Sequence, residues 1–364
     1  MVSFADLETL LQEQNKDEKY CVLLHDYPDP DAVSGGVFFK GLLTGMGFSN
    51  VSVVFGGGMD DQNREFFSKL GLYDNTRGHI DDVFMWNYDV SRQDFPHLFP
   101  QYFDKFIYVD HNGGASSWAR NGKVPEERLL AVVDHHNCQE PPKSPHTDCR
   151  EIGAVSSILA EYLVEGADKY FDGKTLEKLY PLMNLGIHID TNYLREGATD
   201  KDIEMLKSFA SKVDYRLVSS FNRFKRKGDW MDAYGRAYTT RERAYQGANM
   251  ASVGRIKNRR VRGAIPVAAN DLLKEDKIHT IYLFGHDDQY VDVAMRTEVN
   301  GFDYNKIIST FPGAVGGGRN GAGRMQIPTL YFSNGNAQSI EDVERAVKTK
   351  LKEHLEYAFN PKSF

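Results

Sequence analysis

Four ionisable side chains follow directly on a short apolar run near the start of the chain. His25, Asp26, Asp29 and Asp31 lie within seven positions, immediately after the apolar residues 22–24. Carboxylates this close together repel one another unless a positive charge lies among them. The spacing therefore points to cation binding. For the "PDPD" stretch alone, the alternative is a turn held by Asx-type hydrogen bonds.

More carboxylates and imidazoles follow other apolar runs. Asp110 comes after "FIYV", and Asp134, His135 and His136 come after "LLAVV". Asp190 follows the helical pattern "LEKLYPLMNLGI" in the same way. Carboxylate oxygens mixed with a few imidazoles suit Mn²⁺ or Mg²⁺, and two such cations would offset the repulsion. Each residue alone is more often a loop or core residue, so the prediction of a metal site depends on their joint occurrence.

The pattern of the sequence predicts buried strands that alternate with helices and position these residues. The apolar runs are nearly continuous, which is typical of strands buried on both faces of a parallel sheet. They span residues 20–24, 51–55, 82–86, 105–109 and 129–133. In open α/β sheets, ligand sites lie beyond the carboxyl ends of the strands. We therefore expect an α/β fold in which these side chains converge.

Composition limits the class of protein. With 364 residues, 41% hydrophobic and 26% charged, the chain is long enough for two domains. No apolar run reaches the roughly 18 residues of a membrane span, and the amino terminus is acidic, so a cytoplasmic protein is expected. The three cysteines, Cys21, Cys138 and Cys149, have no disulfide-framework spacing and are expected to be reduced. The net charge of -7 gives no global signal for binding duplex nucleic acid.

The motifs resemble the DHH family of phosphoesterases, which includes nano-RNases, cyclic dinucleotide phosphodiesterases, exonucleases and family II pyrophosphatases. The resemblance extends over roughly the first 215 residues. It is carried by "HDYPDPDAVSG" (25–35), the strand ending in Asp110, "VVDHH" (132–136), "GAVSSILAEYL" (153–163) and "GIHIDTNYL" (186–194).

A second resemblance lies near the carboxyl end. "VDVAMRT" (291–297) and "GGGRNGAG" (316–323) are similar to the substrate-binding domain that accompanies many DHH domains. There, a strand arginine and a glycine-rich loop meet the substrate phosphate, since glycines let backbone N–H groups approach an anion. With Ala322 and Gly323 in the Ala-Gly places of that loop, Gly318 stands where the family has histidine. The substrate-binding residues implied are Arg296, Gly316, Gly317, Gly318, Arg319 and Asn320.

The resemblance also implies roles around two cations, most simply Mn²⁺, with Mg²⁺ as the alternative. His25 and Asp29 would hold one cation, Asp31 and His135 the other, with Asp110 bridging and Asp190 completing the set. His136 would face the substrate phosphate, and Asp134 would orient its neighbours.

The bridging position has a second candidate. Asp89 also follows a strand and could supply the bridging carboxylate. Asp110 is preferred because it precedes Asp134 by 24 residues, about one strand–helix–strand unit, whereas Asp89 leaves space for an extra strand. His111 is expected to support the site rather than bind metal.

A basic stretch separates the two regions of resemblance. Residues 221–263 hold twelve Lys and Arg against three Asp and Glu, interleaved with aromatic residues. Such a mixture suits single-stranded nucleic acid, and a linker helix whose aromatic residues pack on the domains is the equal alternative.

The sequence as a whole predicts a two-domain α/β phosphoesterase with its active site in a cleft between the domains. We expect a catalytic domain over 1–215, a basic helical linker over 216–250 and a substrate-binding domain over 251–364. The favoured reaction is hydrolysis of short single-stranded oligonucleotides or linear dinucleotides to 5′-mononucleotides, and a homodimer is left open. Alternatives are a cyclic dinucleotide phosphodiesterase, a 3′-phosphoadenosine phosphate phosphatase, a single-strand exonuclease and, from another class, a non-catalytic nucleotide-binding regulator.

Overall fold

The protein consists of two compact units, each built around its own sheet. The units are Met1–Phe224 and Lys225–Phe364. The expected linker, 216–250, contributes to both of them, because the division follows Phe224. The computed structural model describes residues 2–56, 59, 61–72, 85–88, 99–114, 116, 119, 124–136, 141–226, 228–244, 248–275, 277–299, 301–319, 321–333 and 340–359.

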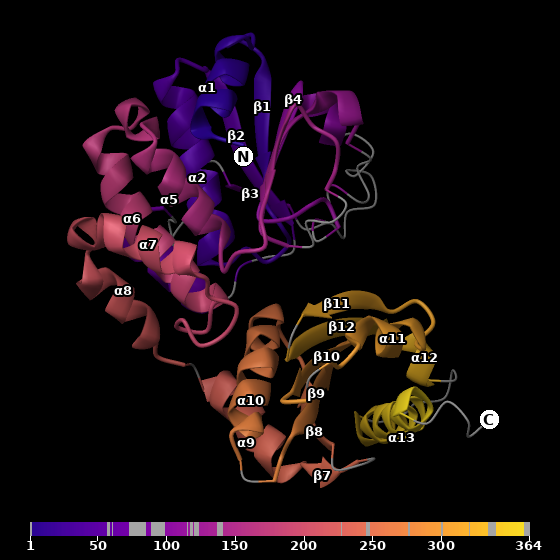
Figure 1. Cartoon of the computed structure of the whole chain (residues 1–364). Coiled ribbons are helices and arrows are strands. Elements are labelled where there is room, and N and C mark those ends of the chain that lie inside the picture. Colours follow the sequence, from indigo (N-terminus) through magenta and orange to yellow (C-terminus); the bar gives the residue numbers. More distant parts are fainter. Residues whose placement is uncertain are drawn as a thin grey trace. The chain divides into compact units, whose positions relative to one another are not determined.

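Unit 1 contains a six-stranded, wholly parallel sheet (Figure 1). Its order is β3-β2-β1-β4-β5-β6, so the direction of winding reverses between β1 and β4. Ligand sites of such sheets lie at this reversal, beyond the carboxyl ends of the strands. The strands are β1 (Lys19–Leu23), β2 (Asn50–Gly56), β3 (Met85–Tyr88), β4 (Lys105–Val109), β5 (Leu129–Asp134) and β6 (His146–Cys149).

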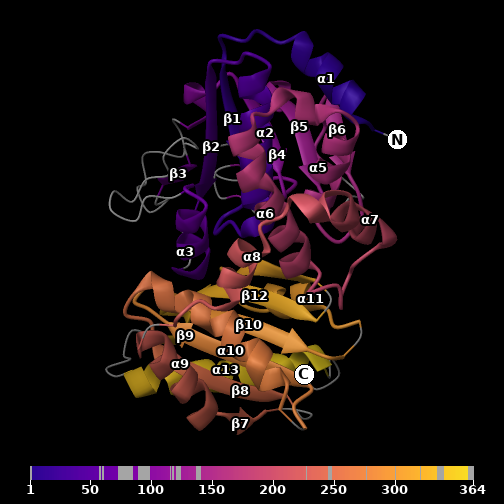
Figure 2. The same ribbon diagram turned by 90° about the vertical axis from the view of Figure 1, so that its left-hand side faces the viewer.

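Helices cover one face of this sheet with the larger core. Alternate strand residues such as Val22, Val53 and Ile107 pack there against α2, α5 and α6, while Leu23, Phe106 and Tyr108 form a smaller core on the other face. In Figure 2 this helical layer faces the viewer. The helices are α1 (Phe4–Gln12), α2 (Pro30–Gly45), α3 (Asp61–Lys69), α5 (Val155–Val164), α6 (Gly173–Asp190), α7 (Asp200–Phe209) and α8 (Tyr215–Asn222).

Unit 2 contains a mixed sheet with helices on both faces. Its order is β11-β12-β10-β9-β8-β7, and only the β8–β9 pair is parallel among the strands described. One core joins the sheet to α9 and α10, and the other joins it to α11 and α13. The elements are α9 (Gly228–Thr239), β7 (Glu242–Arg243), β8 (Asn249–Arg255), α10 (Ala264–Leu273), β9 (Thr280–His286), β10 (Tyr290–Thr297), α11 (Tyr304–Ser309), β11 (Val315–Arg319), β12 (Ala322–Pro328), α12 (Leu330–Ser333) and α13 (Ile340–Phe359).

The α/β class and the parallel sheet are confirmed, with three differences in detail. Strand β6 was not expected, because "HTDC" carries no apolar run. For the run 82–86, only residues 85 and 86 lie among the described residues, and β3 extends onward to Tyr88. The expectation of reduced cysteines is wrong for Cys149, which is disulfide-bonded, whereas Cys21 is a buried free thiol. None of the described helices is both long and apolar enough to cross a membrane.

Helix α6 reaches the site through a close contact at Gly186. A Cβ added there would lie 2.6 Å from Ser156 Oγ, 2.7 Å from Asp31 Oδ1 and 2.9 Å from the Asp31 Cα. Only glycine therefore lets α6 lie this close to α2, and this approach places Asp190 beside the strand ends.

We expect Gly186→Ala to lower the free energy of unfolding by about 1–3 kcal/mol, because the added methyl group overpacks a closed contact. Urea unfolding followed by circular dichroism measures the change. Gly173→Ala, in the first turn of the same helix, is the matched control, since nothing lies within 4 Å of its added Cβ. Equal effects of the two substitutions would contradict the close-contact explanation.

Candidate metal centre

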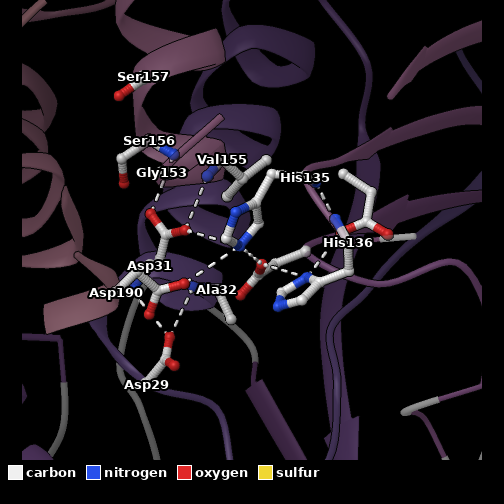
Figure 3. Close-up of polar contacts among 12 residues, drawn as sticks. Asp29, Asp31, Ala32, His135, His136, Gly153, Val155, Ser156, Ser157 and Asp190 are labelled. Carbon is white, nitrogen blue, oxygen red and sulfur yellow. Dashed lines mark hydrogen bonds and ion pairs between the residues drawn. The ribbon is translucent and has the colours of Figure 1, made fainter. Parts of the chain in front are cut away.

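The residues singled out by the motifs converge at the carboxyl edge of the first sheet. Figure 3 shows five of them, namely Asp29, Asp31, His135, His136 and Asp190. His25 follows β1, Asp110 follows β4 directly, and His135 and His136 follow β5. Asp190 is the last residue of α6. The strand order reverses between β1 and β4, and the side chains lie at the carboxyl ends of these strands and of β5. The fold itself therefore brings these sequence-distant side chains together.

The ligand atoms form two groups that share one carboxylate. Within each group, one ligand atom per residue lies within 4.8 Å of the others. Among the described residues, the groups are His25, Asp29 and Asp110, and Asp110, His135, His136 and Asp190. Asp110 is thus placed to serve two cations at once. Asp31 falls outside both groups, and His136 falls inside the second.

Asp110 is held between imidazoles from two strand ends. Its Oδ2 lies 3.3 Å from His25 Nε2, and its Oδ1 lies 3.3 Å from His135 Nε2 and 3.5 Å from His136 Nδ1. The residue is 2% exposed and has a left-handed backbone (φ 61°), which is costly for a residue with a Cβ. Such strain persists only where the surrounding structure enforces it, and it is common at functional sites.

Two histidines are fixed with Nε2 directed at the shared carboxylate. The Nδ1 of His135 lies 3.0 Å from the carbonyl oxygen of Ile152, and the Nδ1 of His25 lies 2.8 Å from that of Asp26. Because a carbonyl oxygen only accepts, each Nδ1 carries the proton and donates it. In the neutral ring, each Nε2 then has a lone pair, as a metal-binding histidine requires.

The donor set fits a cation. His135 Nε2 and Asp110 Oδ1 are both buried, and neither makes a hydrogen bond of good geometry. His135 Nε2 also lies 3.1 Å from Asp190 Oδ2 and 3.9 Å from Asp31 Oδ2. Buried polar atoms are normally paired, so an unpaired imidazole nitrogen and carboxylate oxygen side by side indicate a site for a bound ion.

The charge balance indicates the same need for positive charge. Burial alone would lower the pKa of His25 and His135, yet the carboxylates facing them raise both pKa values well above the ordinary range. Burial and the neighbouring carboxylates Asp110 and Asp190 raise the pKa of Asp31 well above its usual value. The carboxylates therefore depend on imidazolium or on divalent cations to be ionised together.

Asp29 and Asp31 also begin helices. Asp29 is the N-cap of α2, where its Oδ1 accepts hydrogen bonds from the N–H groups of Asp31 (3.0 Å) and Ala32 (3.1 Å). The carboxylate of Asp31 accepts from the N–H groups of Val155 (2.8 Å) and Ser156 (2.9 Å), at the start of α5. An ionised carboxylate has about four lone-pair positions, so both can accept these bonds and still bind an ion.

Asp134 holds His136 and the strand end. Its Oδ1 lies 2.8 Å from the N–H nitrogen of His135, 3.1 Å from that of His136 and 3.0 Å from His136 Nδ1. Asp134 is fully buried, whereas 39% of the His136 side chain is exposed. A buried carboxylate therefore orients an imidazole that solvent can reach.

The two remaining residues near the bridge are placed differently. Asp89 lies outside the described residues. His111 is buried, with its Nε2 2.8 Å from the carbonyl oxygen of Leu23 and its Nδ1 accepting the N–H of Gly113 (2.9 Å). Burial lowers its pKa to about 4. Both ring nitrogens of His111 thus bind backbone groups, and they tie the end of β1 to the segment after β4.

In unit 2, Arg296 lies near the end of β10 and is held by neutral partners. It donates hydrogen bonds to the side chain of Asn270 on α10 and to the carbonyl oxygens of Met295 (2.8 Å) and Gly323 (3.2 Å). None of these partners carries a charge. These hydrogen bonds fix the position of the guanidinium.

The glycines of the loop have different surroundings. Gly318 and Gly323 face each other across β11 and β12, and the ring of Tyr304 covers both. A Cβ at Gly318 would lie 2.6 Å from that ring, and one at Gly323 only 2.4 Å. The space of a side chain at 318 is thus filled by Tyr304. Gly317, which precedes Gly318 on β11, faces open space.

Arg319 ends β11 and is opposite Ala322 of β12, while Asn320 lies outside the described residues.

Five of the twelve basic residues in the stretch 221–263 make the following contacts within unit 2. The guanidinium of Arg226 lies 4.7 Å above the ring of Trp230 and 4.8 Å above that of Tyr234. Other arginines form ion pairs, namely Arg236 with Glu344, Arg241 with Glu275, Arg255 with Asp288 and Arg262 with Asp287. These contacts favour the packed alternative at those positions.

Several residues that shape the site carry no signal of their own in the motifs. The carbonyl of Ile152 and the N–H groups of Val155 and Ser156 act through the backbone, which any residue could supply. Gly186 could have been found, because it precedes Asp190 by one helical turn on the same face. Tyr304 gives no such signal, since nothing in the sequence pairs it with Gly318.

Comparisons with known proteins establish the fold. No family model matches the chain. The uncharacterized protein MJ1633 of Methanocaldococcus jannaschii is 25% identical over 345 residues, which are 94% of this chain and 65% of MJ1633, so the chain spans less than two thirds of that relative. The crystal structure of an exopolyphosphatase-related protein from Bacteroides fragilis matches with a TM-score of 0.67 and 16% identity, covering 98% of this chain and 97% of that one. The chain therefore has the fold of this exopolyphosphatase-related protein over nearly its whole length.

Proposed function

We propose that the chain is a metal-dependent phosphodiesterase of the DHH type that hydrolyses short oligonucleotides or linear dinucleotides to 5′-mononucleotides. The observation that carries this proposal is the position of Asp110, whose carboxylate belongs to two ligand groups at the carboxyl ends of β1, β4 and β5. A carboxylate shared in this way is what a pair of cations acting on one phosphoryl centre requires.

His25 and Asp29 would hold one cation, and His135 and Asp190 the other, with Asp110 between them. Asp31 would belong to the second cation, although its carboxylate also caps α5. Two divalent cations, most simply Mn²⁺, would polarise the phosphoryl group and lower the pKa of an attacking water. The carboxylate and imidazole donors support this choice over a thiolate-bound metal.

His136 would bind the substrate phosphate. Its Nδ1 is directed at Asp134, so the ring is oriented. An imidazolium in this position can donate a hydrogen bond to a phosphoryl oxygen as negative charge develops there. Asp134 is a positioning residue, since it acts through the ring that it orients.

Arg296 and the glycine-rich strand would hold a second phosphate of the substrate. A guanidinium forks two hydrogen bonds onto a phosphate, and Gly317 leaves space for an anion to approach the backbone. A substrate held by one phosphate at this anchor would fit only a few nucleotides before the scissile bond. The proposal therefore favours very short substrates.

The panel that tests the function offers the Mn²⁺-loaded protein a dinucleotide, a long oligonucleotide, cyclic di-AMP, 3′-phosphoadenosine 5′-phosphate, pyrophosphate and polyphosphate. Fastest turnover of the dinucleotide supports the proposal, and faster turnover of another substrate replaces it with that activity. Tight nucleotide binding with no turnover of any substrate would instead identify a non-catalytic regulator.

Asp110→Asn should lower metal content and reduce turnover by more than about 100-fold, because changes of supporting residues alone cost about 10–100-fold. Metal content is measured on the purified proteins by mass spectrometry. Asp104→Asn, at the exposed beginning of the same strand region, is the control and should retain its metal. If Asp89→Asn loses metal and Asp110→Asn does not, the bridging residue is Asp89.

His136→Gln should reduce kcat by about 10²–10⁴-fold with full metal content, because it removes a group that acts on the phosphate. Asp134→Asn should cost about 10–100-fold, since His136 remains but loses its orientation. Metal analysis and steady-state kinetics check both variants. Loss of metal in His136→Gln would make His136 a ligand of the second cation.

Arg296→Ala should lower kcat/KM for a dinucleotide by about tenfold or more, because the substrate loses a charged hydrogen-bond donor. Hydrolysis of bis-nitrophenyl phosphate should hardly change, because this ester needs the metals but has no second phosphate. Arg345→Ala, an arginine of the same unit whose side chain is 77% exposed, is the control. Equal losses on both substrates would place Arg296 in the metal site or in the fold.

A further inference from the structure

A second arginine lies beside Arg296 on the same face of the unit 2 sheet. Arg324 on β12 is opposite Ala294 of β10, and Arg296 is opposite Ala322. The two arginines are thus diagonal neighbours, which on a sheet face corresponds to roughly 7–8 Å between their Cα atoms. Both side chains therefore project from the same face of the sheet.

Arg324 is fixed by a buried carboxylate. Its Nε and terminal nitrogen donate to the two oxygens of Asp292 (2.9 and 2.8 Å), and Asp292 is fully buried. The amide of Gln326 donates to the same carboxylate (3.1 Å), and Arg262 Nε lies 3.4 Å from it. Burial raises the pKa of Asp292, but the charge and hydrogen bonds of Arg324 outweigh this and lower it. The Asp292 carboxylate that holds Arg324 is therefore ionised at neutral pH.

The surface around Arg324 is open. Its side chain is 37% exposed, and Val315, at the edge of the same face, is 49% exposed. Gly317 on β11 is opposite Arg324 and contributes no side chain, and a Cβ added there would meet nothing within 4 Å. Helix α10 covers this face over β9 and β10 (Figure 1).

A buried carboxylate is an expensive way to stabilise a sheet. Replacing a buried ion pair by apolar residues is often neutral or stabilising, because the desolvation of both charges offsets their attraction. The Asp292–Arg324 pair instead orients the guanidinium. Its Nε and one terminal nitrogen are fixed on Asp292, while part of the side chain stays in solvent. This is the arrangement expected of an arginine that must meet an anion in a defined geometry.

We propose that Arg324 and Arg296 together form an anion-binding surface that recognises two neighbouring phosphoryl groups at the end of the substrate. Gly317 lies beside Arg324 on this surface, and a side chain at position 317 would obstruct the ligand. Two sources supply such a group: the 5′-phosphorylated end of an oligonucleotide and an inorganic polyphosphate chain. The inference rests on the proposed function, which it deepens by naming the charge pattern of the substrate.

The experiment measures binding to the full chain in excess chelator, where phosphates cannot bind through metal and no hydrolysis occurs. The probes are 5′-pApA, ApA, tripolyphosphate and inorganic phosphate, titrated by calorimetry. We expect 5′-pApA or tripolyphosphate to bind at least about tenfold more tightly than ApA or phosphate, and Arg324→Gln to remove most of that difference. The tighter of the two multiply charged probes identifies the source.

Arg324→Gln leaves Asp292 without its main partner, so Asp292→Asn with Arg324→Gln is the second variant. It removes both charges, which avoids an unpaired buried carboxylate. It should fold as the wild type by circular dichroism and show the same loss of affinity. Arg345→Gln is the matched control and should bind every probe normally. A folded double variant with wild-type affinities, or an equal loss for all four probes, overturns the inference.

The outcome is separable from that of the proposed function. If no phosphoester is hydrolysed by the metal-loaded chain, yet affinity for 5′-pApA or tripolyphosphate depends on Arg324, the proposed function fails and the anion-binding surface stands. If dinucleotides are hydrolysed but binding is indifferent to Arg324, only the surface is overturned.

Discussion

The mutual repulsion of buried carboxylates is the constraint on which unit 1 depends. The side chains of Asp31, Asp110 and Asp190 are almost completely buried at one edge of the sheet. Two imidazoles from different strand ends offset part of this charge, and their positions require β1, β4 and β5 to end at the same level. The reversal of winding between β1 and β4 supplies that arrangement. The strained backbone of Asp110 is tolerated because its carboxylate must face both imidazoles at once.

Helix starts contribute to the same balance. The carboxylates of Asp29 and Asp31 accept backbone N–H groups at the first turns of α2 and α5, where the helix dipole favours negative charge. The contacts that begin these helices are therefore also electrostatic support for the candidate metal site. Gly186 lets α6 approach Asp31, so that Asp190 at the end of α6 lies beside His135. Fold and site share these contacts, and a change at any of them should affect both.

The sequence predicts this half of the protein well because its signals are local. An apolar run followed by His25, Asp110 or Asp134 reveals both a buried strand and a side chain at its carboxyl end. Strand β6 was missed because it pairs at the edge of the sheet and alternates buried with half-buried residues. The state of Cys149 was also missed, since disulfide pairing depends on distance in space and not on spacing in the chain. The helix-capping roles of Asp29 and Asp31 were not separable from ligation, because the same residue type serves both.

In unit 2, Tyr304 explains why the glycine-rich segment 316–323 has glycine at position 318. Histidine at position 318 would collide with Tyr304, whose ring occupies the space above the paired glycines 318 and 323. The charge that such a histidine would bring must then come from elsewhere on the sheet. In the anion-binding surface that we propose, Arg324 would supply it from β12, where a buried carboxylate holds it on the same face as Arg296 of β10. A histidine is only partly charged at neutral pH, whereas a guanidinium is always charged. The exchange therefore favours a ligand with more negative charge, which is the physical basis for expecting a multiply phosphorylated substrate end at this surface.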